Sequence, residues 1–192
     1  EGVIKGKSEL YNYLKDYDGK ILVNANDRKQ LSLSKNSNRF LFGTDLNVNF
    51  RIKYLNTEKE ELRINYNNKL FKSPLHGEYN LVNIAAAISF GLLFDVPIKF
   101  IQKSILDYQS KNNRSQKLMI NKTQFIMDAY NANPTSMEAA LNAYAGCKFL
   151  KKLVVLGDMF ELGSQSKEEH DNILKLCMKL NIDKICTIGL NF

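Results

Sequence analysis

Two short apolar runs in the second half of the chain each stop abruptly at polar residues, and each is followed by a helical pattern. Residues 125–127 run into the motif DAYNANPTSM (128–137), and residues 153–156 run into GDMFELG (157–163). Each predicts a strand whose carboxyl end opens onto a loop and then a helix. Because ligands of open α/β sheets collect at that edge, the motifs predict an α/β protein that binds a polar or anionic ligand there.

The order of the apolar runs in this half predicts a β-α-β-α-β unit. Strands are expected at residues 117–120, 125–127, 152–156 and 184–188, and helices at 134–146 and 166–180. Strands that alternate with helices form a mainly parallel sheet with right-handed crossovers. Both helix starts carry capping signals, since Asn133 precedes Pro134 and residues 166–169 read Ser-Lys-Glu-Glu.

The first half of the chain predicts a mixture of helices and short strands. Helices are expected at residues 6–14, 80–94 and 97–108, and strands at 20–24, 39–42, 49–55, 61–66 and 70–71. Asn67 and Asn68 are expected to form a hairpin turn, because asparagine tolerates positive φ. The polar stretch 109–116 separates this pattern from the second half, so we expect a domain boundary near residue 111.

Composition excludes several classes of protein. The net charge is +7, but the lysines are spread among Asn and Glu rather than gathered on one arm, so nucleic-acid binding is not expected. A membrane helix needs a run of about 18 apolar residues, and every apolar run in this chain is much shorter. No signal peptide is visible either, so membrane insertion is not expected. The three cysteines lack CxxC spacing and lie in or beside apolar segments, which predicts reduced thiols in a cytoplasmic protein.

Three polar side chains before the second half are candidate nucleotide contacts. Asn80 and Asn83 are three residues apart, so both lie on one face of the first turn of a helix. Their amides offer the donor and the acceptor that an adenine edge requires, although Asn80 alone is equally an N-cap. Arg114 could bind a phosphate or a ribose through its planar guanidinium, or it could be a solvated hinge residue.

The two strand-end loops carry the remaining candidates. Asp128 could accept a hydrogen bond from a ribose hydroxyl or hold a metal-bound water. Tyr130, Asn131 and Asn133 line the loop before a helix whose N-terminus favours anions. The alternative is a capped strand-to-helix loop without a ligand. The carboxylates of Asp158 and Glu161 lie between two glycines and could recognise an ammonium group or serve as caps, and His170 is expected at the surface.

No phosphate loop GxxxxGK[ST], HExxH or GxSxG motif occurs in the chain, so it shows no self-sufficient catalytic site. The assembled motifs, however, resemble the Mur ligase family. They fall in the family's order and are KGKSEL (5–10), VNAND (23–27), GEYNLVN (77–83), NRSQ (113–116), DAYNANPTSM (128–137) and LGDMFELG (156–163). The resemblance spans the whole chain, and the last two motifs are the most specific.

This resemblance implies a fold and a domain organisation. Residues 1–110 would be the end of a central P-loop-type ATPase domain, and residues 111–192 most of a Rossmann-like C-terminal domain with a mainly parallel sheet. The UDP-sugar domain and the phosphate loop would precede Glu1, and the closing strands would follow Phe192. The chain would therefore be a fragment, inactive alone.

The resemblance also implies a reaction. The complete enzyme would be a cytoplasmic, monomeric ATP-dependent acid–amino-acid ligase of peptidoglycan precursor synthesis, joining D-alanyl-D-alanine to UDP-N-acetylmuramoyl-tripeptide through an acyl phosphate. Its cofactors would be ATP and Mg²⁺, and Lys7, or else Lys5, matches the family's carbamylated lysine, which serves catalysis and helps hold the metal.

Nucleotide contacts carry over residue by residue. Asn83, with Asn80 beside it, matches the adenine-contacting asparagine, and Arg114 the hinge arginine. Asp128 matches the aspartate near ribose and phosphate, with Tyr130, Asn131 and Asn133 completing its loop. The chain departs from the family at Tyr79, where many members have histidine. Asp158 and Glu161 are left as candidate contacts for the amine substrate.

Two other functions remain open. One is a different amide ligase, either another Mur ligase or a relative of folylpolyglutamate synthase, although such proteins would be expected to lack the combined YNANP and GDMxELG motifs. The other is a nucleotide-binding module without catalysis, which the missing phosphate loop favours for this chain.

Overall fold

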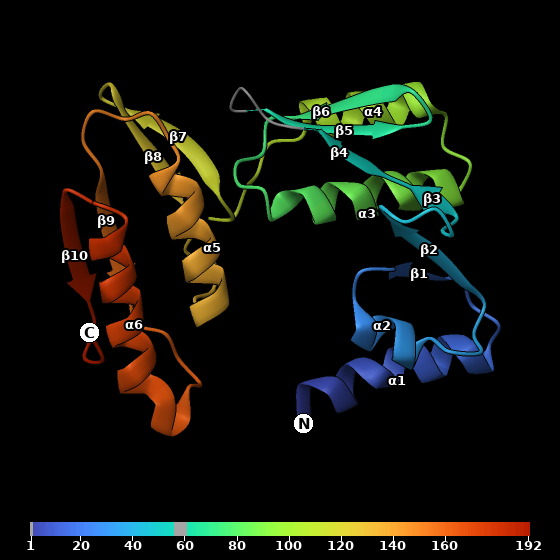
Figure 1. Cartoon of the computed structure of the whole chain (residues 1–192), viewed down its shortest axis with the longest axis horizontal. Coiled ribbons are helices and arrows are strands. Elements are labelled where there is room, and N and C mark those ends of the chain that lie inside the picture. Colours follow the sequence, from blue (N-terminus) through green and yellow to red (C-terminus); the bar gives the residue numbers. More distant parts are fainter. Residues whose placement is uncertain (1, 56–60) are drawn as a thin grey trace. The chain divides into compact units, whose positions relative to one another are not determined.

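The structure is a computed structural model that describes residues 2–55 and 61–192. The chain forms two compact units, whose elements are labelled in Figure 1. Unit 1 contains Glu1–Pro74 and Asn80–Tyr108, and unit 2 contains Leu75–Tyr79 and Gln109–Phe192. The polypeptide therefore passes from one unit to the other three times. That these units are the family's central and C-terminal domains stays a prediction.

Unit 1 combines a parallel sheet, an antiparallel sheet and helices. The parallel sheet has the order β1-β2-β3 and the antiparallel sheet the order β4-β5-β6. The elements are α1 (Gly2–Asp16), β1 (Ile21–Asn24), α2 (Arg28–Leu33), β2 (Arg39–Gly43), β3 (Phe50–Arg51), β4 (Lys53–Leu55), β5 (Leu62–Tyr66), β6 (Lys69–Ser73), α3 (Asn80–Leu93) and α4 (Ile98–Asp107).

The apolar helix α3 forms the centre of the core of unit 1. It packs against β1, β2, β5 and α4, and its residues Ile84, Ala85 and Ile88 are buried. They lie three or four residues apart, which is the spacing of one helix face. The alternating residues Leu62 and Ile64 of β5 are buried as well, so the apolar periodicities read from the sequence correspond to this core.

The strand predicted at residues 49–55 is wrong as a single element. It is interrupted at Ile52, which is fully buried and whose N–H donates to the Gly43 carbonyl at 2.7 Å. Before Ile52, β3 pairs in parallel with β2, and after it, β4 pairs antiparallel with β5. Because both halves alternate, the sequence pattern did not reveal that the chain changes sheets there.

Two helices of unit 1 also differ from expectation. Helix α1 begins at Gly2, before the predicted start at residue 6. Helix α2 was not predicted, although its signal was present: the Asp27 carboxylate accepts the Lys29 and Gln30 N–H groups, as an N-cap does. The hairpin turn at Asn67 and Asn68 is confirmed, with φ of +46° and +60° between β5 and β6.

Unit 2 contains two separate strand pairs. Its elements are β7 (Gln116–Ile120), β8 (Thr123–Met127), α5 (Pro134–Ala145), β9 (Leu153–Gly157), the 3-10 turn η1 (Gly163–Gln165), α6 (Ser166–Lys179) and β10 (Lys184–Ile188). Strands β9 and β10 pair in parallel, with Leu153 opposite Lys184, and β7 pairs antiparallel with β8.

The expected parallel sheet is therefore confirmed only for β9 and β10. Within the described residues, β8 has no ladder with β9 and pairs with β7 instead. The β7–β8 pairing itself is local, because Asn121 and Lys122, the two residues between these strands, have φ of +46° and +65°. Positive φ at both central residues is the geometry of a tight hairpin, which joins neighbouring antiparallel strands.

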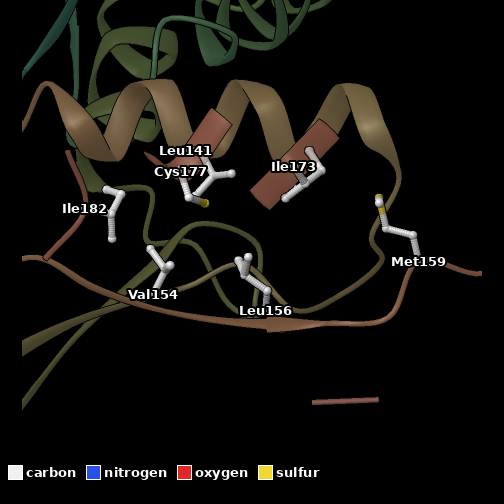
Figure 2. Close-up of a cluster of buried hydrophobic side chains, with 7 residues drawn as sticks. All are labelled: Leu141, Val154, Leu156, Met159, Ile173, Cys177 and Ile182. Carbon is white, nitrogen blue, oxygen red and sulfur yellow. The ribbon is translucent and has the colours of Figure 1, made fainter. Parts of the chain in front are cut away.

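The core of unit 2 lies between the two helices and β9, as Figure 2 shows for seven buried side chains. Val154 and Leu156 alternate on β9 and meet Ile173 and Cys177 of α6. Burial raises the pKa of the Cys177 thiol, which makes it a poor nucleophile. All three cysteines are free, and no helix within the described ranges is long and apolar enough to cross a membrane.

The helix cap predicted at Asn133 is confirmed, and it forms a capping box with Ser136. Asn133 caps α5, since its side chain accepts the Ser136 N–H while the Ser136 hydroxyl accepts the Asn133 N–H. The box predicted at residues 166–169 is wrong. Ser166 is already inside α6, because the preceding 3-10 turn η1 leads directly into the helix and Gln165 holds the cap position without a side-chain bond.

Replacing Lys122 by glycine should stabilise unit 2. The φ of +65° at Lys122 is unfavourable for a residue with a β-carbon by roughly 1 kcal/mol. Lys122→Gly should therefore raise the free energy of unfolding by about 1 kcal/mol in urea denaturation. Lys122→Ala keeps the β-carbon and is the matched control; equal stability of the two variants would contradict this explanation.

Candidate functional site

The end of β8 in unit 2 is held against the segment that leads into β7. Asp128 follows β8, and its Oδ1 accepts the Ser115 N–H at 3.1 Å. One residue later, the Ala129 N–H donates to the Asn113 carbonyl at 2.8 Å. Ser115 is buried, and its hydroxyl hydrogen-bonds that of Tyr79 at 2.5 Å. Asp128 itself is exposed, so its carboxylate is anchored but open to a ligand.

Arg114 and Tyr130 form a stacked pair beside this contact. The Arg114 guanidinium carbon lies 3.7 Å from the centre of the Tyr130 ring, close enough for a cation–π interaction. Both residues are exposed. Since Arg114 precedes Ser115 and Tyr130 is two residues after Asp128, one short stretch of unit 2 presents a cation, an aromatic ring and a carboxylate. We call Arg114, Asp128 and Tyr130 the strand-end cluster.

Asn131 and Asn133 have hydrogen bonds within their own loop. The Asn133 oxygen caps α5 through the Ser136 N–H at 2.9 Å. The Asn131 side-chain oxygen accepts the Ala132 N–H, also at 2.9 Å. The capped-loop interpretation is therefore sufficient to explain both residues, and their role toward a nucleotide stays a prediction.

Asn80 and Asn83 lie in unit 1 and face each other on the first turn of α3. The Asn83 amide nitrogen donates to the Asn80 oxygen at 3.1 Å. Asn80 is only 8% exposed, whereas Asn83 is exposed. Asn80 is the first helical residue rather than the one before the helix, so the pair forms one connected amide surface in which Asn83 is the member open to solvent.

Asp158 holds the chain after β10. Its carboxylate accepts the Leu190 N–H at 2.9 Å, the Asn191 N–H and the Asn191 side-chain amide at 2.8 Å. Burial by itself raises the pKa of this carboxyl, but these donors outweigh it and hold the pKa below the ordinary value. A β-carbon at Gly189 would lie 2.1 Å from the Asp158 carboxyl carbon, so glycine is required there.

The two acidic candidates of this loop therefore differ. Asp158 is engaged in a structural contact, which leaves it poorly placed to recognise an ammonium group. Glu161 is exposed and has a φ of +65°. Non-glycine residues at positive φ are uncommon and concentrate at functional sites. Glu161 is thus the better candidate for a substrate contact, and both assignments stay predictions.

The surface position expected for His170 is wrong. His170 is 1% exposed and lies on the inner face of α6. Its Nε2 accepts the Met159 N–H at 3.0 Å, and its Nδ1 lies 2.6 Å from the Ser166 carbonyl. Only the neutral tautomer with hydrogen on Nδ1 satisfies both partners. His170 thereby joins the loop after β9 to the first turn of α6, a role that no sequence motif indicated.

Lys7 and Lys5 lie on helix α1, and both are exposed. Lys7 lies within the helix predicted at residues 6–14, and because α1 begins at Gly2, Lys5 is helical as well. Residues two apart on a helix do not share a face, so only one of the two lysines can point toward a given site. Within the described ranges, no three His, Cys, Asp or Glu side chains form a group that could hold a metal ion.

Comparison with known proteins identifies the family. Residues 113–191 match the family model of the Mur ligase, glutamate ligase domain. Over 98% of its length, the chain is 28% identical to the UDP-N-acetylmuramoyl-tripeptide–D-alanyl-D-alanine ligase of Bacillus subtilis (strain 168), and it covers 42% of that protein. A crystal structure of MurF from Acinetobacter baumannii matches 99% of this chain and 43% of its own, with a TM-score of 0.80 and 27% identity. The chain belongs to the Mur ligase family.

This Mur ligase chain spans about two fifths of the length of the B. subtilis and A. baumannii proteins. The ligase of the same name from Treponema pallidum (strain Nichols) is 32% identical over 68% of the chain, which covers 28% of that protein. The α/β fold, with separate parallel and antiparallel sheets, agrees with the solved Mur ligases. The family model includes the strand-end cluster, whereas Asn80 and Asn83 precede the residues that it matches.

Replacing Asp158 should change how stability depends on pH. Because the pKa of Asp158 is lowered by folding, its stabilising effect is present above the ordinary carboxyl pKa and is lost as the pH falls through the folded value. Below about pH 4 the wild type should lose stability more steeply than Asp158→Asn. Thermal unfolding across this range measures the slopes. Asp171→Asn, at an exposed site on α6, is the control and should keep the wild-type slope.

Proposed function

We propose that this chain supplies nucleotide and substrate contacts of an ATP-dependent amide ligase that adds D-alanyl-D-alanine to UDP-N-acetylmuramoyl-tripeptide in peptidoglycan precursor synthesis. The observation that carries the proposal is the strand-end cluster, which presents Arg114, Tyr130 and Asp128 from one edge of unit 2. The names of the relatives supply the substrates. A monomer in the cytoplasm is part of the same proposal.

The side chains of the strand-end cluster are chemically suited to bind a nucleoside triphosphate. The exposed Arg114 guanidinium can bind phosphate or ribose oxygens in a fork geometry, and stacking on Tyr130 limits its orientations. The Ser115 N–H donates to Oδ1 of Asp128, so the second carboxylate oxygen of this exposed residue can accept from ribose hydroxyls. Asn83 can offer both a donor and an acceptor to an adenine edge.

In the proposed reaction, the substrate carboxylate attacks the γ-phosphate of ATP and releases ADP, and the amine of D-alanyl-D-alanine then displaces inorganic phosphate from the acyl phosphate to form the amide. The side chains of this chain then contribute by binding and orienting, which are the main catalytic terms in such transfers. Glu161 is assigned to the ammonium group of D-alanyl-D-alanine because it is exposed on the loop after β9.

Lys7 could ligate Mg²⁺ only as a carbamate. The described residues do not gather other acidic side chains into a group that could bind a metal ion. The described residues therefore do not make a Mg²⁺ site by themselves. The roles of Lys7 in catalysis and metal binding remain predictions from family resemblance.

A nucleotide-binding module without catalysis is the second candidate function. It is favoured by one observation, the absence of a GxxxxGK[ST] motif from the sequence. Both functions require ATP binding, and they differ in whether phosphate is released when D-alanyl-D-alanine and the UDP-linked peptide are added. For the 192-residue chain we expect binding without phosphate release.

Arg114→Ala and Asp128→Ala should each weaken ATP binding by the chain about tenfold, because each removes a charge-assisted hydrogen bond. Isothermal titration measures the affinity, and circular dichroism shows whether the variants are folded. Asp171→Ala changes an exposed carboxylate elsewhere in unit 2 and should bind like the wild type. No ATP binding by the wild type, or unchanged affinity in both cluster variants, would refute the assignment.

Glu161→Gln should weaken the binding of D-alanyl-D-alanine about fivefold, since it removes the charge from a hydrogen bond to the ammonium group. Chemical-shift titration of the amides of residues 157–163 reports both affinity and place. Glu168→Gln, an exposed acidic residue in the first turn of α6, is the control. Dipeptide that shifts none of these amides would contradict the proposed role of Glu161.

A further inference from the structure

The segment Leu75–Tyr79 lies between β6 and α3 in the chain, yet it packs as part of unit 2. It is attached at both ends. The His76 Nε2 lies 3.4 Å from the Cys147 sulfur, just beyond α5, and the Tyr79 hydroxyl lies 2.5 Å from that of Ser115. We call this segment the strap. These contacts hold it at the start of β7 and beside the end of α5.

A glycine allows the strap to bend back on itself. Gly77 has a φ of +85°, and a β-carbon there would lie 2.3 Å from the Tyr79 ring. Any other residue at position 77 would therefore be strained and would also collide with Tyr79. The bend is what lets the Tyr79 ring fold over Gly77 while its hydroxyl reaches Ser115.

Ser115 links Tyr79 to the strand-end cluster through its own hydrogen bonds. It is 7% exposed and has a φ of +49°, an unfavourable backbone conformation that neighbouring contacts must maintain. Its hydroxyl hydrogen-bonds Tyr79, and its N–H donates to Asp128 at 3.1 Å. Arg114, the preceding residue, has its guanidinium over Tyr130. A shift of Ser115 would therefore disturb Asp128 and Arg114 together.

We propose that Tyr79 is a positioning residue for the strand-end cluster, acting through Ser115 to hold Asp128 and Arg114 in place. The tyrosine touches no reacting group in this scheme. Its hydroxyl fixes a strained backbone, and the fixed backbone orients the two side chains that face the ligand. The ligand itself, a nucleoside triphosphate, rests on the function proposed above, but the positioning does not.

The test measures the positioning separately from the ligand. In Tyr79→Phe, which keeps the ring and removes the hydroxyl, exchange of the Ser115 amide hydrogen should become about fivefold faster by NMR, because a hydrogen bond that fixes Ser115 is lost. Tyr144→Phe is the matched control, since Tyr144 bonds the Leu153 backbone in the same unit. It should leave Ser115 exchange within about twofold of wild type.

ATP titration of the same proteins gives the second readout. Tyr79→Phe should bind ATP about fivefold more weakly, with Tyr144→Phe like the wild type. If the wild type binds no ATP, the proposed function fails, while the exchange rate still decides the positioning. Unchanged Ser115 exchange in Tyr79→Phe would overturn the inference. Should that variant not fold, Ser115→Ala removes the other hydroxyl, and an unchanged Asp128 side-chain environment by NMR would then overturn it.

Discussion

Carboxylates at the ends of strands organise unit 2, because each accepts backbone N–H groups from a segment distant in sequence. Asp128, after β8, accepts the Ser115 N–H, and Asp158, after β9, accepts those of Leu190 and Asn191. Backbone donors near a strand end must find a partner when water is excluded. A charged acceptor makes these bonds about twice as strong as neutral ones, so the loops that could meet a ligand are fixed before any ligand arrives.

The same contacts change how the loops should be understood. A carboxylate beyond a strand is easily interpreted as a ligand contact, and both Asp128 and Asp158 were interpreted in that way from sequence. Asp158 has its acceptor capacity directed at the chain after β10, whereas Asp128 gives one oxygen to Ser115 and remains exposed. Substituting either residue would therefore alter local structure as well as binding, so folding and affinity must be measured together.

Sequence patterns predicted the local features of this chain well. The cap at Asn133 and the turn at Asn67 and Asn68 follow from side-chain chemistry that acts within a few residues. Some features that the patterns did not predict depend on tertiary packing, namely the change of sheet at Ile52 and the burial of His170. The β7–β8 hairpin and the cap of α2 at Asp27 are local, and their turn and cap signals were not used. In the candidate site, Tyr79 was noticed only as a departure from the family, since 36 residues separate it from Ser115.

The strap has a practical consequence for dissecting the protein. A gene segment that starts at Gln109, directly after the last residue of unit 1, would encode β7 to β10 but omit Leu75–Tyr79. The product would expose the surface that this pentapeptide covers, and it would lack the contacts of the Ser115 hydroxyl with Tyr79 and of the Cys147 sulfur with His76. Poor solubility of such a truncated product would reflect the missing piece and not an inherently weak C-terminal fold.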